Sequence, residues 1–485
     1  MSTGEPVARR RAAAALLFVL LFTASQGLVW AAYYAWGTKA LIGDEQTYLA
    51  TAQAIRAGGA WMPGSIWPPL QPLLLALLDA ATGAAVPALQ LLQGFLFVAC
   101  GALLRDLWRR LGGSVAAANS AAALFLLNPA TAAYAQWLWP EMPHLFLLLA
   151  VLDLLARAAT PLRALAAGAC AGLALLAKSL LSPFWPAFLL LFARRPPPFV
   201  AWRPALLFVL ALGLLTGPAL LHGWHAWGRP MIADSSVYNL WIGLTDRWRS
   251  DYVQDLGGRT LPAFLASGAT PQERNAVYLG KLREHVATAG VPALLAGQLG
   301  RQYFRLFSAK TPLQSQLPGA ACAGHLSVYP VPAWMARLLA WSGGLWHALT
   351  LVAAAFGLCC WRWDWRRRDE RAAVAAAAPH GADAGAPPHG PDAGAPPRVA
   401  LQAVVALFLA YQLVLFLLIH VKARFLLPML PFLCGFGGSF LVACVRRQPS
   451  PRVSCSPPRL VAGALLALLL LFLAFGGPLL DRSCG

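Results

Sequence analysis

Two adjacent carboxylates, Asp44 and Glu45, are the first residues of this sequence that could do chemistry. A carboxylate can take the proton from a hydroxyl group as that hydroxyl attacks a substrate. After the pair, Tyr48, Ala52 and Ile55 recur at helical spacing, which predicts a short amphipathic helix with Asp44 at its N-cap. Asp44 is therefore either a helix cap or a general base, and one residue can do both.

A third carboxylate and a lysine lie at the ends of other apolar segments. Glu141 begins one such segment, where it either complements a helix dipole or faces a cavity shared with Asp44. Lys178 ends another. Because a lysine deep in lipid costs about 2.5–3.5 kcal/mol on insertion scales, we expect Lys178 to reach the interface or to meet an anion.

Three potential hydrogen-bond donors, His420, Lys422 and Arg424, crowd a very short segment between two long apolar runs. Arginine pairs bidentately with phosphate, whereas lysine serves phosphate as a point charge. The same basic side chains could instead reach out to lipid headgroups. The segment is thus either a phosphate site or an interfacial anchor.

The amino-acid composition indicates the class of protein in which these residues lie. Of the 485 residues, 59% are hydrophobic and 12% are charged, whereas soluble domains carry about 25% charged residues. The sequence therefore predicts an all-α polytopic membrane protein and excludes a soluble enzyme, a disordered protein and a disulfide scaffold. The net charge of +19 comes with arginines clustered at the ends of apolar segments, so we attribute it to the positive-inside rule and expect no nucleic-acid partner.

We predict about 11 transmembrane helices, from apolar runs compared with the roughly 20 residues that cross a bilayer. Basic residues gather between alternate runs, which places the N-terminus in the cytoplasm and the loop after the first run outside. The runs 142–156, 164–178 and 180–193 are short, so their boundaries are the softest. The candidate spans are residues 12–36, 85–104, 114–138, 142–156, 164–178, 180–193, 204–221, 335–361, 399–420, 424–445 and 460–480.

This topology divides the chain into three regions. An N-terminal transmembrane module, residues 1–221, includes the outer loop 37–84, and a large extracytoplasmic loop subdomain follows at 222–334. The C-terminal helices occupy 335–480 and are interrupted by a cytoplasmic linker, 362–398, whose Gly, Ala and Pro content predicts disorder. We expect the helix that begins near Asp44 to lie along the outer membrane surface.

Six short motifs, taken in order, resemble those of the GT-C superfamily of integral-membrane glycosyltransferases. The resemblance is greatest to the protein O-mannosyltransferase and aminoarabinose-transferase branch, and it runs from about Arg11 to Arg446. Phe425 stands where that branch usually has tyrosine. The motifs are Asp44-Glu45, Trp67-Pro68-Pro69-Leu70-Gln71-Pro72-Leu73, Glu141, Gly172–Lys178, Asn239–Gly243 and His420–Pro428.

The resemblance implies transfer of a sugar from a polyprenyl-phosphate donor to a hydroxyl of a lipid, glycan or protein acceptor, with inversion. Such a donor leaves as a phosphate, so the reaction needs one base and cations rather than a second acid. Asp44 is then the expected base, and Glu45 orients the acceptor or holds a cation. We expect Lys178, Lys422, Arg424 and His420 to bind the donor phosphate, with Glu141 in the same cavity.

The sequence also indicates whether a metal is bound, in which membrane the protein lies, and which other functions are open to it. The histidines and cysteines show no metal-binding spacing, so no protein metal site is predicted, and a divalent cation is not required by the sequence. Alanine and arginine richness favours a bacterial inner membrane. A secondary transporter or flippase of lipid-linked sugars is the alternative function, although transporters usually place their charges near the bilayer midplane. A noncatalytic relative that keeps the fold is a third.

Overall fold

The fold is helical throughout the part of the chain that can be described. No strand occurs there, apart from one isolated bridge between Trp361 and Val453. Most of the predicted first span, 12–36, and nearly all of the predicted linker, 362–398, lie outside the described residues. The computed structural model describes residues 35–62, 66–157, 160–192, 201–245, 257–309, 329–363, 398–446 and 452–477, with single positions between 16 and 27 and between 313 and 318.

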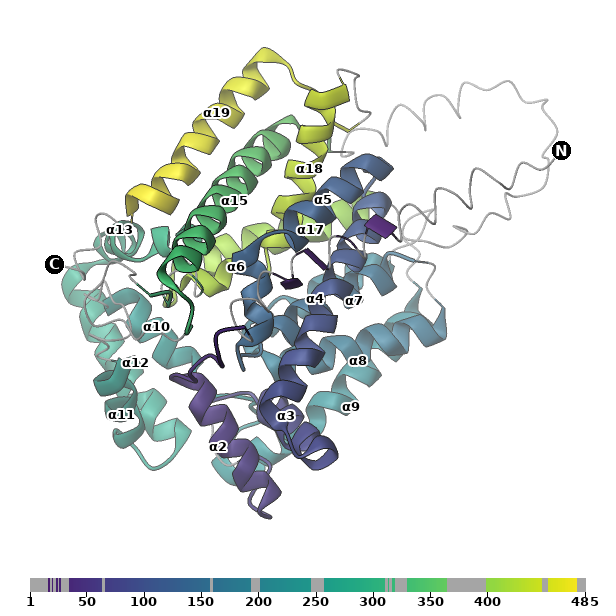
Figure 1. The fold of residues 1–485 in the computed structure, drawn as a ribbon. Coiled ribbons are helices and arrows are strands. Elements are labelled where there is room, and N and C mark those ends of the chain that lie inside the picture. The colour runs from purple at the N-terminus through teal and green to yellow at the C-terminus, as the bar shows by residue number, and fades with distance from the viewer. Residues whose placement is uncertain are drawn as a thin grey trace, which may run out of the picture.

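Five helices among the described residues are long and apolar enough to cross a bilayer, or six if one bent pair counts as a span. They make the chain a multi-pass membrane protein, as predicted, whereas the number eleven stays a prediction. The five are α4 (Ala85–Arg110), α9 (Trp202–Trp227), α15 (Ala333–Cys360), α17 (Arg398–Leu415) and the segment Pro457–Gly476, of which α19 is Pro457–Leu471 (Figure 1).

The predicted single span 114–138 is broken in the structure. Helix α5 (Val115–Leu126) is followed by α6 (Pro129–Ala132) and the 3-10 helix η1 (Ala133–Gln136), and the two halves are bent by 64°. Asn128 causes the break, because its side-chain oxygen accepts hydrogen bonds from Ala130 N and Thr131 N and so starts a new helix.

The predicted span 180–193 is also corrected. This segment forms short 3-10 helices, η2 (Ser179–Leu181) and η3 (Trp185–Phe192), rather than an α-helix. Pro183 and Pro186 account for the difference, because proline has no backbone N–H and clashes with the preceding turn of an α-helix.

Helix α8 (Pro161–Ala177) packs tightly against α9, and the two lie side by side in Figure 1. Glycine makes this approach possible. A Cβ on Gly168 would lie 2.2 Å from Phe208 O, and one on Gly172 would lie 2.8 Å from the Cβ of Leu215. Small residues four apart serve such close packing in membrane helices, and here they place Lys178 at the end of α8.

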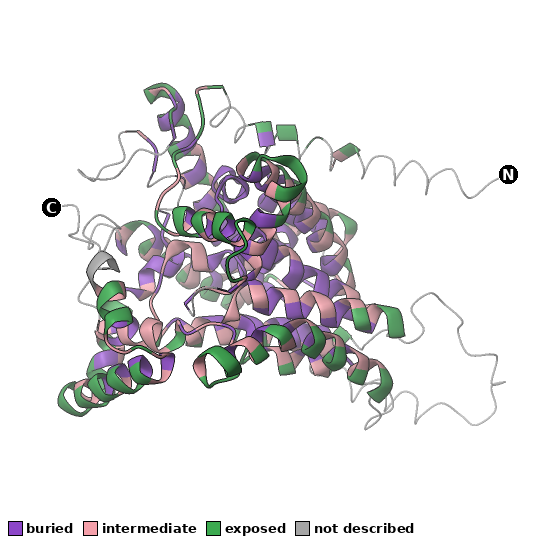
Figure 2. Ribbon diagram, turned by 90° about the horizontal axis from the view of Figure 1, so that it is seen from below, coloured by how far each residue is buried: buried purple, intermediate pink, exposed green. Residues whose placement is uncertain are grey.

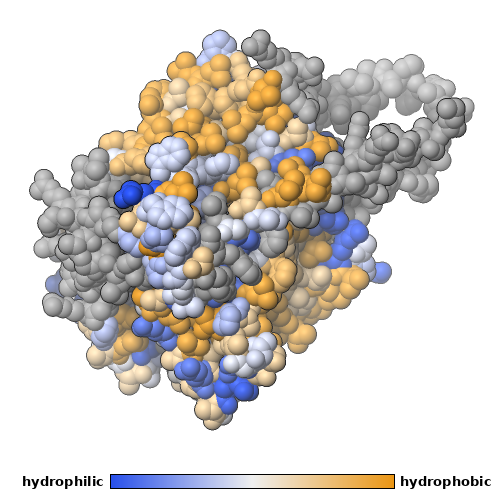
Figure 3. All heavy atoms as spheres, in the orientation of Figure 1, coloured by the Kyte–Doolittle hydropathy of each residue, from blue (hydrophilic) through white to orange (hydrophobic). Residues whose placement is uncertain are grey.

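Apolar side chains remain exposed on the long helices. The burial map of Figure 2 places the buried residues centrally, with exposed residues along the outer helix faces. In Figure 3 apolar residues cover much of the visible surface. Leu214 on α9, Trp341 on α15 and Leu465 on α19 are 74%, 69% and 64% exposed. Such a surface suits contact with lipid chains rather than water.

The two long segments that are predicted to lie outside the membrane fold into shorter helices. Residues of the predicted loop 37–84 form α2 (Asp44–Arg56) and α3 (Leu70–Thr82), and Tyr48 and Ala52 are buried on α2, as its amphipathic pattern predicts. The loop 222–334 contains α10 (Ser236–Thr245), α11 (Gly257–Ala266), α12 (Pro271–Ala289), α13 (Val291–Arg301) and η5 (Tyr303–Phe307). The division into three regions is still a prediction.

Candidate active site

An ion pair joins two residues that are 380 positions apart in the sequence, Asp44 and Arg424. Asp44 Oδ2 lies 2.8 Å from Arg424 Nη2, and the two side chains are 15% and 11% exposed. The prediction that Asp44 caps its own helix is wrong, because Gly43, with a φ of 55°, is the N-cap and no side chain caps α2. The Asp44 carboxylate pairs with Arg424 rather than with the backbone of its own helix.

Arg424 bridges two carboxylates. Its Nε lies 3.3 Å from Glu141 Oε1, and Lys178 Nζ lies 2.9 Å from the same oxygen. Glu141 begins α7 (Glu141–Leu155) and its side chain is 2% exposed. Residues Asp44, Glu141, Lys178 and Arg424, which come from four separate segments, form what we call the central cluster.

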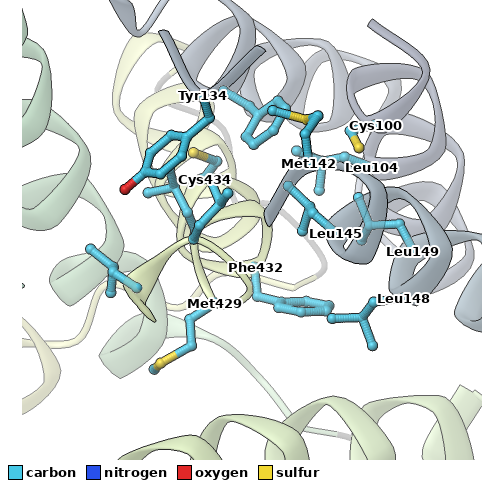
Figure 4. Close-up of a cluster of buried hydrophobic side chains, with 14 of the residues drawn as sticks. Cys100, Leu104, Tyr134, Met142, Leu145, Leu148, Leu149, Met429, Phe432 and Cys434 are labelled. Carbon is cyan, nitrogen blue, oxygen red and sulfur yellow. The ribbon is translucent and has the colours of Figure 1, made fainter. Parts of the chain in front are cut away.

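The start of α7 is anchored by hydrophobic packing beneath Glu141. Figure 4 shows Met142, Leu145 and Leu149 of α7 in a cluster with Cys100 and Leu104 of α4, and with Tyr134, Met429, Phe432 and Cys434. Met142 and Leu145 are fully buried. Close packing of this kind leaves little room for movement, so the first turn of α7 holds Glu141 in place.

The charges of the central cluster act on Asp44 together. Burial opposes ionisation of the Asp44 carboxyl, but Arg424, Lys422 and Lys178 outweigh it and hold its pKa below the ordinary value of 3.8. Lys422 therefore lies close enough to Asp44 to act on it electrostatically. At neutral pH Asp44 is a carboxylate, and its negative charge is matched by its neighbours.

The turn that carries His420, Lys422 and Arg424 is held by α10. His420 N donates to Asn239 O at 3.0 Å, and a Cβ on Gly243 would lie 2.4 Å from Leu418 O. Only glycine allows this approach. The Asn239–Gly243 motif thus positions the basic turn, as a structural element rather than as a source of reacting groups.

Two glutamines complete the support of the turn. Gln298 Nε2 donates to Phe416 O and Ile419 O, at 3.1 and 2.9 Å. Gln302 Oε1 accepts from Val421 N at 3.3 Å. These bonds satisfy backbone groups that an irregular segment would otherwise bury unpaired, so they stabilise its shape.

A second buried ion pair lies beside the central cluster. Glu45 Oε2 is 2.6 Å from Lys39 Nζ with both side chains 0% exposed, and Oε1 accepts from Leu138 N at 2.9 Å. Burial raises the pKa of Glu45 despite the Lys39 ammonium. Both carboxylate oxygens of Glu45 are thus occupied by Lys39 and the backbone, an arrangement that fixes the start of α2 and so the position of Asp44.

Two tryptophans, Trp137 and Trp139, lie between the side chains of Lys39 and Arg424. Lys39 Nζ lies 3.9 Å from the ring centroid of Trp137, Trp137 stacks on Trp139 at 4.1 Å, and Arg424 Cζ lies 4.4 Å from the Trp139 ring. Cations are attracted to the faces of aromatic rings, most strongly to tryptophan. We call this row of four side chains the tryptophan stack. Its two cations are paired with the consecutive acids of α2.

Glutamines from α3 and α4 fix the backbone that carries the tryptophans. Gln71 Nε2 donates to Leu138 O at 3.0 Å, and Gln93 Nε2 donates to Trp137 O at 2.7 Å. Gln90 Nε2 donates to Gln136 O at 2.9 Å. The non-helical stretch before Glu141 is thereby satisfied within the apolar interior.

The structure therefore brings together most of the predicted site residues. Asp44, Glu141, Lys178 and Arg424 are in direct contact, and His420 and Lys422 lie in the same basic turn. Glu45 instead pairs with Lys39, a residue that sequence reasoning missed, as it missed the tryptophans and glutamines. Glutamines within apolar segments were the available signal, because polar groups at membrane depth are costly unless they are used.

The carboxylates of the central cluster pair with basic side chains. In the part of the chain that the structure describes, no group of three or more His, Cys, Asp and Glu side chains is placed to hold a metal ion. The guanidinium of Arg424 lies between Asp44 and Glu141. Whether the protein uses a divalent cation is still a matter of prediction.

Comparison with known proteins gives likenesses among solved structures alone. No family model and no curated protein matches the chain. The Archaeoglobus fulgidus oligosaccharyltransferase in its apo form is similar at 11% identity and a TM-score of 0.49, over 97% of this chain and 56% of that one. The chain thus spans little more than half the length of that protein.

ArnT from Cupriavidus metallidurans is also similar. In the apo state it matches at 18% identity and a TM-score of 0.36, over 95% of this chain and 78% of that one. Bound to undecaprenyl phosphate, it matches at 16% identity and a TM-score of 0.34, over 91% and 78%. At these identities and scores the likeness establishes neither a reaction nor a substrate for this chain.

Proposed function

We propose that this protein is a membrane glycosyltransferase that moves a sugar from a polyprenyl-phosphate donor to a hydroxyl acceptor on the extracytoplasmic face. One observation carries the proposal: a largely buried cluster in which Asp44, Glu141, Lys178 and Arg424 converge from four segments. Transporters usually place their charges near the bilayer midplane, whereas the sequence pattern puts these residues at the outer ends of the predicted spans. The ordered sequence motifs also support the proposal.

The cations of the cluster are suited to a phosphate leaving group. In the transfer, the acceptor oxygen bonds to the anomeric carbon of the sugar, and the bond from that carbon to the phosphate oxygen breaks. The electron pair leaves with the phosphate, where Arg424 and Lys178 of the cluster, together with Lys422 from the same turn as Arg424, stabilise the added negative charge. Preorganised charges in a water-poor site are usually the largest single contribution to catalysis.

Asp44 takes the proton that the acceptor hydroxyl loses. It lies at the first position of α2, beside the cations that hold the phosphate, so the base and the leaving group are close together. Glu45 positions Asp44 through Lys39 and Leu138 N rather than reacting itself. Inversion at the anomeric carbon, the choice among lipid, glycan and protein acceptors, and the bacterial inner membrane stay parts of the proposal.

The first experiment follows sugar transfer from a panel of polyprenyl-phosphate sugars by membranes that contain wild-type protein or Asp44→Asn. A general base typically contributes about 10²–10⁴-fold, so Asp44→Asn should lower the rate at least about a hundredfold. Asp79→Asn is the matched control, because Asp79 pairs with exposed Arg56 away from the cluster and should keep full activity.

Two results would contradict the proposal. Asp44→Asn that inserts normally and transfers sugar nearly as fast as wild type would remove Asp44 as the base. Wild-type protein that consumes no donor of the panel but carries an intact lipid-linked sugar across a vesicle membrane would instead identify a flippase.

A further inference from the structure

The charged side chains of the central cluster are largely buried and pair with one another. The Arg424 side chain is 11% exposed and the Glu141 side chain is 2% exposed. Arg424 Nη2 contacts Asp44, Arg424 Nε contacts Glu141, and Lys178 Nζ contacts Glu141. The carboxylates of the protein therefore hold the cations that a phosphate would need.

This pairing also restrains Asp44. A carboxylate bonded to a guanidinium, with its pKa held below the ordinary value, is a weak acceptor for the proton of a hydroxyl. The groups that act on Asp44 are Arg424 and Lys422 from the basic turn and Lys178 from the end of α8, and Glu141 faces it across Arg424. An anion that neutralises these cations would make Asp44 a stronger base.

We propose that donor binding works by exchange: the phosphate displaces Asp44 from Arg424, so the ligand that occupies the cations also frees the base. This inference rests on the proposed function. It implies an order, because the acceptor hydroxyl can lose its proton to Asp44 only after the phosphate is bound. Without donor, Asp44 stays paired and the acceptor is not activated.

Trp139 gives Arg424 a contact that does not change during the exchange. The guanidinium lies over the Trp139 ring at 4.4 Å, and Trp139 is itself stacked on Trp137. A cation held on a ring face keeps its position while its hydrogen-bond partner changes from a carboxylate to a phosphate. The structure thus assigns Trp139 as a positioning residue for the phosphate ligand Arg424.

The test measures binding of a short-chain polyprenyl phosphate, without sugar, to purified protein in phosphatidylcholine nanodiscs by calorimetry. Because Asp44 competes with the phosphate, Asp44→Asn should bind the probe about tenfold more tightly than wild type, within the usual range of such couplings. Asp79→Asn makes the same charge change outside the cluster and should leave binding unchanged. The gain should vanish when Asp44→Asn is combined with Arg424→Gln.

Trp139 is tested in the same assay. Trp139→Leu should weaken binding by roughly twofold to thirtyfold, the range of a cation–π contact, and Trp139→Phe should restore part of the loss. On an Arg424→Gln background, Trp139→Leu should have no further effect. A loss that persists on that background would show that Trp139 acts on the fold rather than through Arg424.

Failure of the exchange and failure of the proposed function look different. If wild type binds the probe and Asp44→Asn binds it equally or more weakly, the exchange is wrong while the proposed function stands. A gain that survives Arg424→Gln, or that Asp79→Asn reproduces, reflects overall charge and also overturns the exchange. If neither wild type nor any variant binds the probe, the proposed donor itself is wrong.

Discussion

Lys39→Met should destabilise the protein, because it leaves a buried carboxylate without its cation. Lys39 and Glu45 are 0% exposed and 2.6 Å apart, and breaking such a pair typically costs about 3–5 kcal/mol. Glu45 keeps its bonds from Ile42 N and Leu138 N, so we expect a loss near the lower limit, about 3 kcal/mol. Burial raises the pKa of Glu45 in the folded protein. The free energy of unfolding of wild type should therefore fall as the pH rises from 4.5 through the raised pKa of Glu45.

The assay is reversible unfolding in mild detergent, with the free energy of unfolding measured at acidic and neutral pH. At acidic pH Glu45 takes up a proton, so the cost of Lys39→Met should shrink there. The double variant Lys39→Met with Glu45→Gln should recover much of the loss, because no unpaired charge is left. A cost below about 1 kcal/mol at neutral pH, as for exposed pairs, would refute this account.

Three further predictions concern the cluster and its support. Arg424→Lys keeps the charge but loses the planar fork that binds phosphate through two N–H groups, so sugar transfer should fall by roughly tenfold to a hundredfold, the effect of one charged hydrogen bond. Unchanged transfer would contradict this. The pKa of Asp44 is lowered in the folded protein, so wild type should be more stable than Asp44→Asn above pH 3.8. That difference should disappear as the pH falls through the lowered pKa of Asp44, and thermal melts at a series of acidic pH values measure it; a difference that does not change with pH would contradict this. Gln93→Leu removes the donor to Ala135 O and Trp137 O and should cost roughly 1–3 kcal/mol per carbonyl left unpaired, measured by unfolding with the exposed Gln46→Leu as control.

Much of the candidate site could be predicted from the sequence. Asp44, Glu141, Lys178 and Arg424 stand out because a charge at the end of an apolar segment is visible in a short stretch of sequence. The pattern of Tyr48 and the residues after it likewise predicted α2 correctly, since amphipathic periodicity is a local property. Roles that depend on one segment alone were therefore within reach.

Local patterns were less reliable where a bend or a competing partner intervened. The run 114–138 has the apolarity of one span, but the Asn128 side chain bonds the backbone ahead of it and starts a second helix. Asp44 has the residue type of an N-cap, but its carboxylate pairs with Arg424 and makes no hydrogen bond to cap the helix backbone. In both cases specific side-chain contacts set a local structure that the average preference of the segment does not predict.

By itself the sequence determined a polytopic helical membrane protein and the individual charges at its helix ends, since hydrophobic periodicity and composition act along the chain. Only the tertiary structure decided which charges meet. Asp44 pairs with Arg424, 380 positions away, whereas the adjacent Glu45 pairs with Lys39 and does not join the central cluster. Such pairings depend on how the helices pack and bend, because an ion pair forms only where opposite charges come within about 4 Å of each other.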